Sequence, residues 1–137
     1  MLFTQKSEVD IHEMSPLALA FVGDAVLELL VRARLVGTTR LQPNRLHTVA
    51  THYVSAHAQN LELDIIEPML TDAEAAVLRR GKNASKATVA KHATVQEYRA
   101  STGFECLLGW LYLSGQLDRV HELFDTLWQQ FDPNETR

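Results

Sequence analysis

Two long apolar segments of the chain each contain a glycine near the middle, and this pair of glycines most constrains the fold. Gly23 lies inside LALAFVGDAVLELLV, and Gly109 lies inside GFECLLGWLYL. Both segments are typical of buried helices, although glycine in a helix is less favourable than alanine by about 1 kcal/mol. Because glycine in a buried helix often permits close approach of another backbone, the pattern is consistent with two helices that cross at these residues.

A carboxylate accompanies each glycine. Asp24 follows Gly23, and Glu105 precedes Gly109 by one helical turn. Glu105 is the only charged residue between positions 100 and 117, so no neighbour at i±3 or i±4 can pair with it. An unpaired carboxylate on a mostly buried helix must be protonated, hydrogen-bonded or bound to a cation. The alternative is that Glu105 faces solvent beside the hydroxyl residues that precede it.

Asp24 is open to two interpretations. Asp24, Glu28 and Arg32 are spaced i, i+4, i+8, which is typical of a salt-bridged outer face. If the two glycine-containing helices do cross, however, Asp24 and Glu105 converge. Two converging carboxylates offer the hard oxygen ligands that Mg²⁺ or Mn²⁺ prefers. Spacing alone does not decide between the outer face and the metal site.

The rest of the chain also has helical patterns, with no convincing strand, repeat or low-complexity linker. We therefore expect one all-α domain, a helical bundle, over residues 1–137. The predicted helices span residues 17–36, 44–61, 73–80, 94–113 and 117–131, with a short helical turn at 63–69. The first is capped by Ser15, begins with Pro16 and ends at Gly37. The helix over 73–80 is capped by Thr71 or Asp72 and ends at Gly81. Residues 83–91 are small, polar and basic, with only a weak helical pattern.

Positive charge is concentrated in one window of an otherwise acidic chain. The formal net charge is −4, yet positions 79–99 contain six basic residues and one acid, so this window carries +5 and the remainder −9. Such a window is suited to binding a polyanion. The alternative interpretation is a solvated, lysine-bearing loop.

Other features limit the class of protein. Cys106 is the only cysteine, which excludes an intrachain disulfide and fits a reducing, cytoplasmic setting. The N-terminus has no signal-peptide pattern, and charged residues interrupt the apolar stretches, so we expect neither secretion nor a membrane span. Cys–His metal motifs, phosphate-binding glycine loops and serine nucleophile motifs are absent from the sequence.

Two segments resemble the motifs of the ribonuclease III family. Residues 19–27, LAFVGDAVL, are similar to that family's signature helix, L-E-F-L-G-D-A-V-L. Residues 104–113, FECLLGWLYL, resemble its second catalytic segment, F-E-A-L-I-G-A-I-Y-L. The order and spacing of the two motifs also match. Residues 79–83, RRGKN, and 98–105, YRASTGFE, resemble the Mini-ribonuclease III subfamily in particular, and the resemblance extends from Ser15 to Trp128.

This resemblance implies a homodimer of all-helical catalytic domains that hydrolyses double-stranded RNA in a metal-dependent reaction, leaving 5′-phosphate and 3′-hydroxyl ends. Asp24 and Glu105 match the family's catalytic and metal-binding carboxylates, with Mg²⁺ as the expected ion and Mn²⁺ as a substitute. Phe21 matches an aromatic residue that packs into the partner subunit, although it is also consistent with an ordinary core residue. The subfamily points to a precursor of large-subunit (23S) ribosomal RNA as the substrate.

The chain departs from the broader family at three acidic positions, which are occupied by Leu17, Ala20 and Thr102. Two carboxylates per site remain. Any second metal ion would need water or RNA oxygens for much of its coordination.

We expect a chain of this length to have no room for the separate RNA-binding domain of the longer enzymes, and therefore expect the catalytic domain to hold RNA by itself. We expect an RNA-binding arm that contacts phosphates and 2′-hydroxyls and consists of Arg79, Arg80, Lys82, Asn83, Lys86 and Lys91.

Two alternatives remain open at this point. One is a non-catalytic, duplex-RNA-binding or ribosome-associated dimer of the same fold. The presence of both carboxylates counts against it, because acids beside phosphates repel them unless a cation intervenes. The other is an unrelated helical interaction module, in which Asp24 is solvated and the basic window binds a protein.

Overall fold

A computed structural model describes residues 7–85 and 93–134, and within these ranges the regular structure is entirely helical. This confirms the predicted all-α class. The elements in chain order are the 3₁₀-helix η1 (Ile11–Glu13), α1 (Pro16–Thr38), α2 (Pro43–Val54), α3 (Ala56–Ile66), the 3₁₀-helix η2 (Glu67–Met69), α4 (Asp72–Ala84), α5 (Val95–Leu113) and α6 (Leu117–Gln130).

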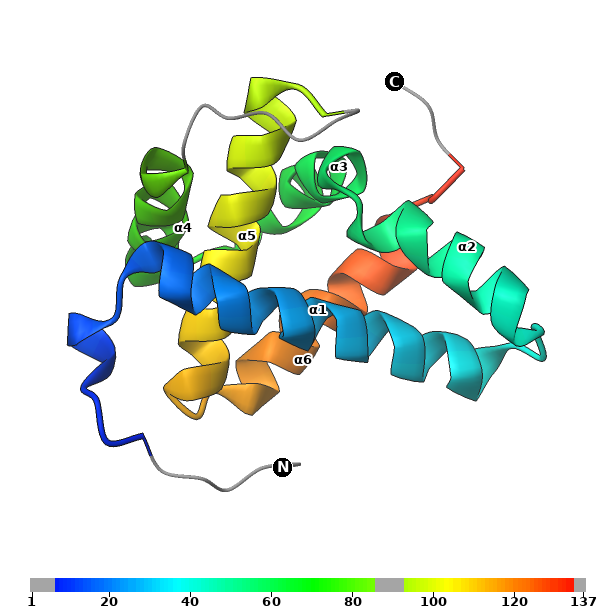
Figure 1. The fold of residues 1–137 in the computed structure, drawn as a ribbon, viewed down its shortest axis with the longest axis horizontal. Coiled ribbons are helices and arrows are strands. Elements are labelled where there is room, and N and C mark those ends of the chain that lie inside the picture. The colour runs from blue at the N-terminus through cyan, green and yellow to red at the C-terminus, as the bar shows by residue number, and fades with distance from the viewer. Residues whose placement is uncertain (1–6, 86–92, 135–137) are drawn as a thin grey trace.

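The helices are arranged around α5. Helix α1 crosses α5 and shares the most extensive contact of any pair, while α3 and α4 also pack against α5 (Figure 1). Helix α2 packs on α1, and α6 packs against α3 and α5. The core lies between these helices and includes Leu19, Leu27, Val31, Leu63, Ile66, Leu107, Leu108, Leu111, Leu123 and Leu127, all almost fully buried.

The predicted helix starts follow from side-chain caps. The Ser15 hydroxyl accepts a hydrogen bond from the Ala18 amide at the start of α1, with Pro16 as its first residue. Thr71 caps α4, and Thr94 caps α5. Both threonines form capping boxes with the glutamate three residues later, which satisfies two otherwise free amides at each helix start.

Two predicted helix ends are wrong, because glycine does not end the helix in either case. Helix α1 continues through Gly37 to Thr38, and the Thr39 amide still bonds to the Leu35 carbonyl. Helix α4 continues through Gly81 to Ala84. A Cβ atom on Gly81 would lie 2.6 Å from the Cβ of Cys106, so this glycine allows close packing of α4 on α5.

The predicted helix over residues 44–61 is in fact two helices. Ser55 has an extended backbone (φ −63°, ψ 157°) and its hydroxyl accepts a hydrogen bond from the Ala58 amide, so it caps α3. Helix α3 then runs through much of the predicted turn at 63–69, and η2 completes it. Of the weakly predicted segment 83–91, residues 83–84 end α4, and residues 86–92 lie outside the described ranges.

Within the described ranges, every helix is too short or too polar to cross a lipid bilayer.

Candidate active site

Gly23 and Gly109 are the points at which α1 and α5 touch. A Cβ atom on Gly23 would lie 1.6 Å from the backbone oxygen of Glu105, and one on Gly109 would lie 1.9 Å from the backbone oxygen of Leu19. Neither position has space for a side chain, since real Cβ contacts are essentially never shorter than 3.0 Å. The two helices therefore do cross at their glycines, as the sequence pattern allowed, and the crossing is a backbone-to-backbone contact.

This crossing brings the carboxyl groups of Asp24 and Glu105 together. The pKa of Glu105 is raised to about 7, chiefly by burial, and the charge of Asp24 and a hydrogen bond with its carboxyl act in the same direction. Glu28 contributes a smaller effect in the same direction. Asp24 is exposed whereas Glu105 is half-buried, so the pair lies at the protein surface with only Asp24 fully open to solvent. Without a cation, burial and the neighbouring carboxylates therefore favour the protonated form of Glu105 more than in an exposed glutamate.

Gln59 on α3 also belongs to this site, and the sequence interpretation missed it. Its Nε2 donates to Glu105 Oε2 over 3.0 Å and to the Val54 carbonyl over 2.9 Å. This hydrogen bond lowers the pKa of Glu105 and partly offsets the effect of burial. The break at Ser55 was the missing signal: once α3 begins there, Gln59 falls on the buried face of a helix.

The charges around the two carboxylates leave them uncompensated. Arg32 Nε lies 3.0 Å from Glu28 Oε2, so the predicted outer salt bridge exists but does not include Asp24. Among the described residues, neither Asp24 nor Glu105 forms an ion pair with a lysine or arginine. Two adjacent acidic groups without a counter-charge fit a divalent cation that prefers oxygen ligands.

The site offers no third acidic ligand. In the described part of the chain, no group of three or more His, Cys, Asp or Glu side chains is arranged to hold a metal ion. Ala20 is buried, and the Thr102 hydroxyl donates to the Tyr98 carbonyl over 3.0 Å. The positions at which the broader family has acids therefore supply no carboxylate. Water and substrate oxygens would have to complete the coordination of a cation.

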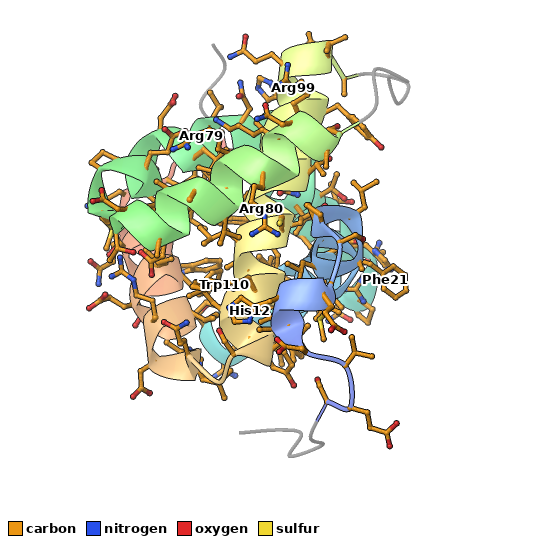
Figure 2. The ribbon with its side chains drawn as sticks, turned by 90° about the vertical axis from the view of Figure 1, so that its left-hand side faces the viewer. His12, Phe21, Arg79, Arg80, Arg99 and Trp110 are labelled. Atoms are coloured by element: carbon orange, nitrogen blue, oxygen red, sulfur yellow. The ribbon has the colours of Figure 1, made fainter. Side chains whose placement is uncertain are left out.

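Phe21 is exposed on the signature helix. Its side chain is 83% exposed, and Figure 2 shows it extending from α1 at the edge of the molecule. The interpretation of Phe21 as a core residue is therefore wrong for the isolated chain. Leu17, one turn earlier, is also among the exposed apolar residues.

The basic window forms a surface on α4 and the start of α5. Arg79 and Arg80 are exposed and leave α4 on opposite sides, with Arg99 at the beginning of α5 (Figure 2). Lys82 is half-buried, and its Nζ lies 3.4 Å from Glu67 Oε1, so its charge is partly neutralised.

Arg99 joins the end of α4 to α5. Its Nε donates to the Lys82 carbonyl over 3.1 Å, and its Nη2 donates to Asn83 Oδ1 over 3.0 Å. Of the predicted RNA-binding residues, Lys86 and Lys91 lie outside the described ranges.

Comparison with known proteins identifies relatives over most of the chain. Residues 17–116, which run from the second residue of α1 past the end of α5, match the Ribonuclease III domain. The Mini-ribonuclease 3 of Enterococcus faecalis is 45% identical over 85% of this chain and 89% of its own length. That of Symbiobacterium thermophilum is 46% identical over 80% of this chain and 85% of its own length. A crystal structure of a protein from Fusobacterium nucleatum has a TM-score of 0.80 and 27% identity, covering 91% of this chain and 98% of that one.

Proposed function

Because this chain belongs to the ribonuclease III family, we propose that Asp24 and Glu105 are the metal-binding carboxylates at which it hydrolyses double-stranded RNA. The chain is a double-strand-specific endoribonuclease, and enzymes of this family depend on divalent metal ions. Family membership rules out the unrelated interaction module. The observation that carries the assignment of the site is the crossing at Gly23 and Gly109, which places an exposed and a half-buried carboxylate together.

Mg²⁺ is the proposed ion, with Mn²⁺ as a substitute. When bound, it would activate a water molecule and stabilise the negative charge that develops on the scissile phosphate. Asp24 and Glu105 would hold it through their oxygens, and Gln59 would keep Glu105 turned toward Asp24. Because the pKa of Glu105 is about 7, a proton competes with the metal ion for this carboxylate below neutral pH.

The reaction is the hydrolysis of a phosphodiester. The water oxygen forms a bond to phosphorus, and the bond from phosphorus to the 3′ oxygen breaks. The leaving 3′ oxygen takes up a proton, so the products carry a 5′-phosphate and a 3′-hydroxyl. Asp24 and Glu105 would hold the metal ion and would not contact the phosphate directly, because an acid directly beside a phosphate would repel it.

The proposed RNA-binding arm consists of Arg79, Arg80, Lys82, Asn83, Lys86 and Lys91. Arg79 and Arg80 are the strongest candidates, because both are exposed and neither forms an ion pair within the described ranges. Lys82 contributes less, since Glu67 shares its charge. The contacts would be made to phosphates and 2′-hydroxyls, because A-form RNA hides its base edges in a deep, narrow groove. One catalytic domain over residues 1–137 would then bind and cut the RNA.

The active form is proposed to be a homodimer with Phe21 at the interface. A phenylalanine that is 83% exposed leaves a large apolar surface in water, and burying it against a second copy would recover that free energy. Each subunit would then cut one strand of the duplex. The non-catalytic dimer is disfavoured, because a protein that only binds RNA has no use for two uncompensated carboxylates near the phosphates.

The proposed substrate is a stem of the precursor of 23S ribosomal RNA, matured in the cytoplasm. The test is incubation of this stem, a generic duplex and a single strand with the protein and Mg²⁺, followed by analysis of the product ends. Cleavage of the duplexes only, with 5′-phosphate and 3′-hydroxyl ends and a faster rate on the precursor stem, supports the proposal. Equal rates on both duplexes would contradict the proposed ribosomal RNA substrate. Binding of duplex RNA without any cleavage would contradict the proposed endoribonuclease activity.

A further inference from the structure

Two polar side chains on α3 are almost fully buried, and one of them, Gln59, contacts the proposed metal site. Gln59 is 1% exposed and Glu62 is 0% exposed. Within the described part of the chain, Gln59 Oε1 and both carboxylate oxygens of Glu62 have no hydrogen-bond partner. All three atoms are acceptors, and leaving buried acceptors unpaired is strongly unfavourable. The proposed reaction does not account for Glu62.

The orientation of the Gln59 amide is fixed by its neighbours. Nε2 donates one hydrogen to Glu105 Oε2 and the other to the Val54 carbonyl. Both neighbours are acceptors, so a flipped amide would place Oε1 against two oxygens. Both N–H groups of the Gln59 amide therefore already donate hydrogen bonds, and Oε1 requires a donor from another residue.

Glu62 is placed to supply that donor. It lies three residues after Gln59 on the same face of α3, a spacing at which helical side chains meet. Burial raises the pKa of Glu62 well above its ordinary value, because water is excluded and no residue in the described ranges forms an ion pair with it. A neutral carboxyl has one O–H donor, and one such proton would pair Gln59 Oε1 with Glu62.

We propose that Gln59 is a positioning residue for Glu105, and that a protonated Glu62 holds the Gln59 amide by donating to its Oε1. The chain of contacts then runs from Glu62 through Gln59 to the metal-binding carboxylate. The Val54 carbonyl at the end of α2 also holds the Gln59 amide in place. The break between α2 and α3 at Ser55 therefore helps to position Gln59. This inference rests on the proposed function, since Glu105 is its metal-binding end.

The consequence is a dependence of metal affinity on two residues that do not touch the metal. Groups that orient a ligand from behind typically change metal affinity or activity about 10- to 100-fold when removed. Gln59→Met keeps the length and volume of the side chain but removes the donor. Glu62→Met likewise removes the proton, whereas Glu62→Gln keeps an N–H donor at the same place.

The experiment is calorimetric titration with Mn²⁺ of the full chain and its variants, alongside the Mg²⁺ concentration that gives half-maximal cleavage. Gln59→Met is expected to weaken Mn²⁺ binding about tenfold and to raise the Mg²⁺ requirement similarly. Glu62→Met is expected to act in the same direction, and Glu62→Gln to restore wild-type affinity. Gln129→Met, at an exposed glutamine on α6, is the matched control and should change nothing.

A second measurement covers the case in which Glu62→Met does not fold. The infrared difference spectrum between the metal-saturated wild type and Glu62→Gln should contain the carbonyl band of a protonated carboxyl, and this band should shift in Gln59→Met. Absence of the band, or equal Mn²⁺ affinity of wild type and Gln59→Met, overturns the inference alone. A wild type that neither binds Mn²⁺ nor cuts duplex RNA overturns it together with the proposed function.

Discussion

Replacing Gly23 by alanine is expected to separate α1 from α5 and so disable the site without touching either carboxylate. The added Cβ would start 1.6 Å from the Glu105 backbone oxygen, and ordinary contact begins at 3.4 Å. The two backbones must therefore move apart by about 1.8 Å, because no flexible side-chain end is available to yield.

The cost follows from this displacement. Overpacking of a tight contact destabilises a protein by about 1–3 kcal/mol, and a clash between two backbones belongs at the upper end of that range. Alanine regains up to about 1 kcal/mol in helix propensity. The net loss of about 2 kcal/mol corresponds to a fall in Tm of roughly 5–10 °C for a domain of this size.

The Gly23→Ala variant should lose cleavage activity even under conditions in which it remains folded. The clash is with the peptide of Glu105 itself, so the carboxylate moves relative to Asp24, and a misplacement of about 1 Å can reduce a rate about 100-fold. The assay is cleavage of a labelled duplex RNA in Mg²⁺, with circular dichroism to measure Tm. Residual cleavage is to be measured well below the Tm of the variant, so that the folded protein is compared.

Gly37→Ala is the matched control, because Gly37 lies in the same helix and an added Cβ there meets no atom within 4 Å. This variant should cut at the wild-type rate, with an equal or slightly higher Tm. The reasoning is refuted if Gly23→Ala retains wild-type cleavage and Tm, or if Gly37→Ala is equally damaging.

Three further predictions concern the pH response, the interface and RNA binding. The pKa of Glu62 is raised in the folded state from an ordinary value of 4.5, so its contribution to stability is complete below that pH and is lost as pH rises toward the folded pKa, by up to about 1.4 kcal/mol per unit. Urea unfolding at pH 5 and pH 8 should show wild type losing more stability than Glu62→Gln, and parallel losses would contradict this. Phe21→Asp should sediment as a monomer with intact helicity, whereas an unchanged dimer would remove Phe21 from the interface. The double variant Arg79→Ala, Arg80→Ala should weaken binding to all duplexes and reduce the slope of log Kd against log salt by about 2, and an unchanged slope would remove both arginines from the arm.

The sequence predicted the features that depend on local chemistry. Gly23 and Gly109 are unfavourable in helices, and their presence in two buried helical segments indicated that α1 and α5 could cross there. Ser15 and Thr71 were recognisable as helix starts because their hydroxyls satisfy free amides within three residues.

The features that the sequence did not predict depend on which helix faces pack against one another in the folded protein. Ser55 sits in a continuous apolar pattern, so the break between α2 and α3 was invisible, and with it the buried face that carries Gln59 and Glu62. Gly81 has the sequence signature of a helix end, yet it serves the packing of α4 on Cys106. Glycines at helix ends and glycines at helix contacts look alike until the neighbouring helix is placed.

The most direct test of the metal site at the glycine crossing is single-turnover cleavage of a labelled duplex RNA by Glu105→Gln, with its RNA affinity measured in parallel. Glutamine keeps the size of the side chain but removes the charge that binds the metal. The expected result is wild-type RNA affinity with cleavage reduced by at least about 100-fold in Mg²⁺. Cleavage by Glu105→Gln at the wild-type rate would contradict the proposed site and place the chemistry elsewhere on the molecule.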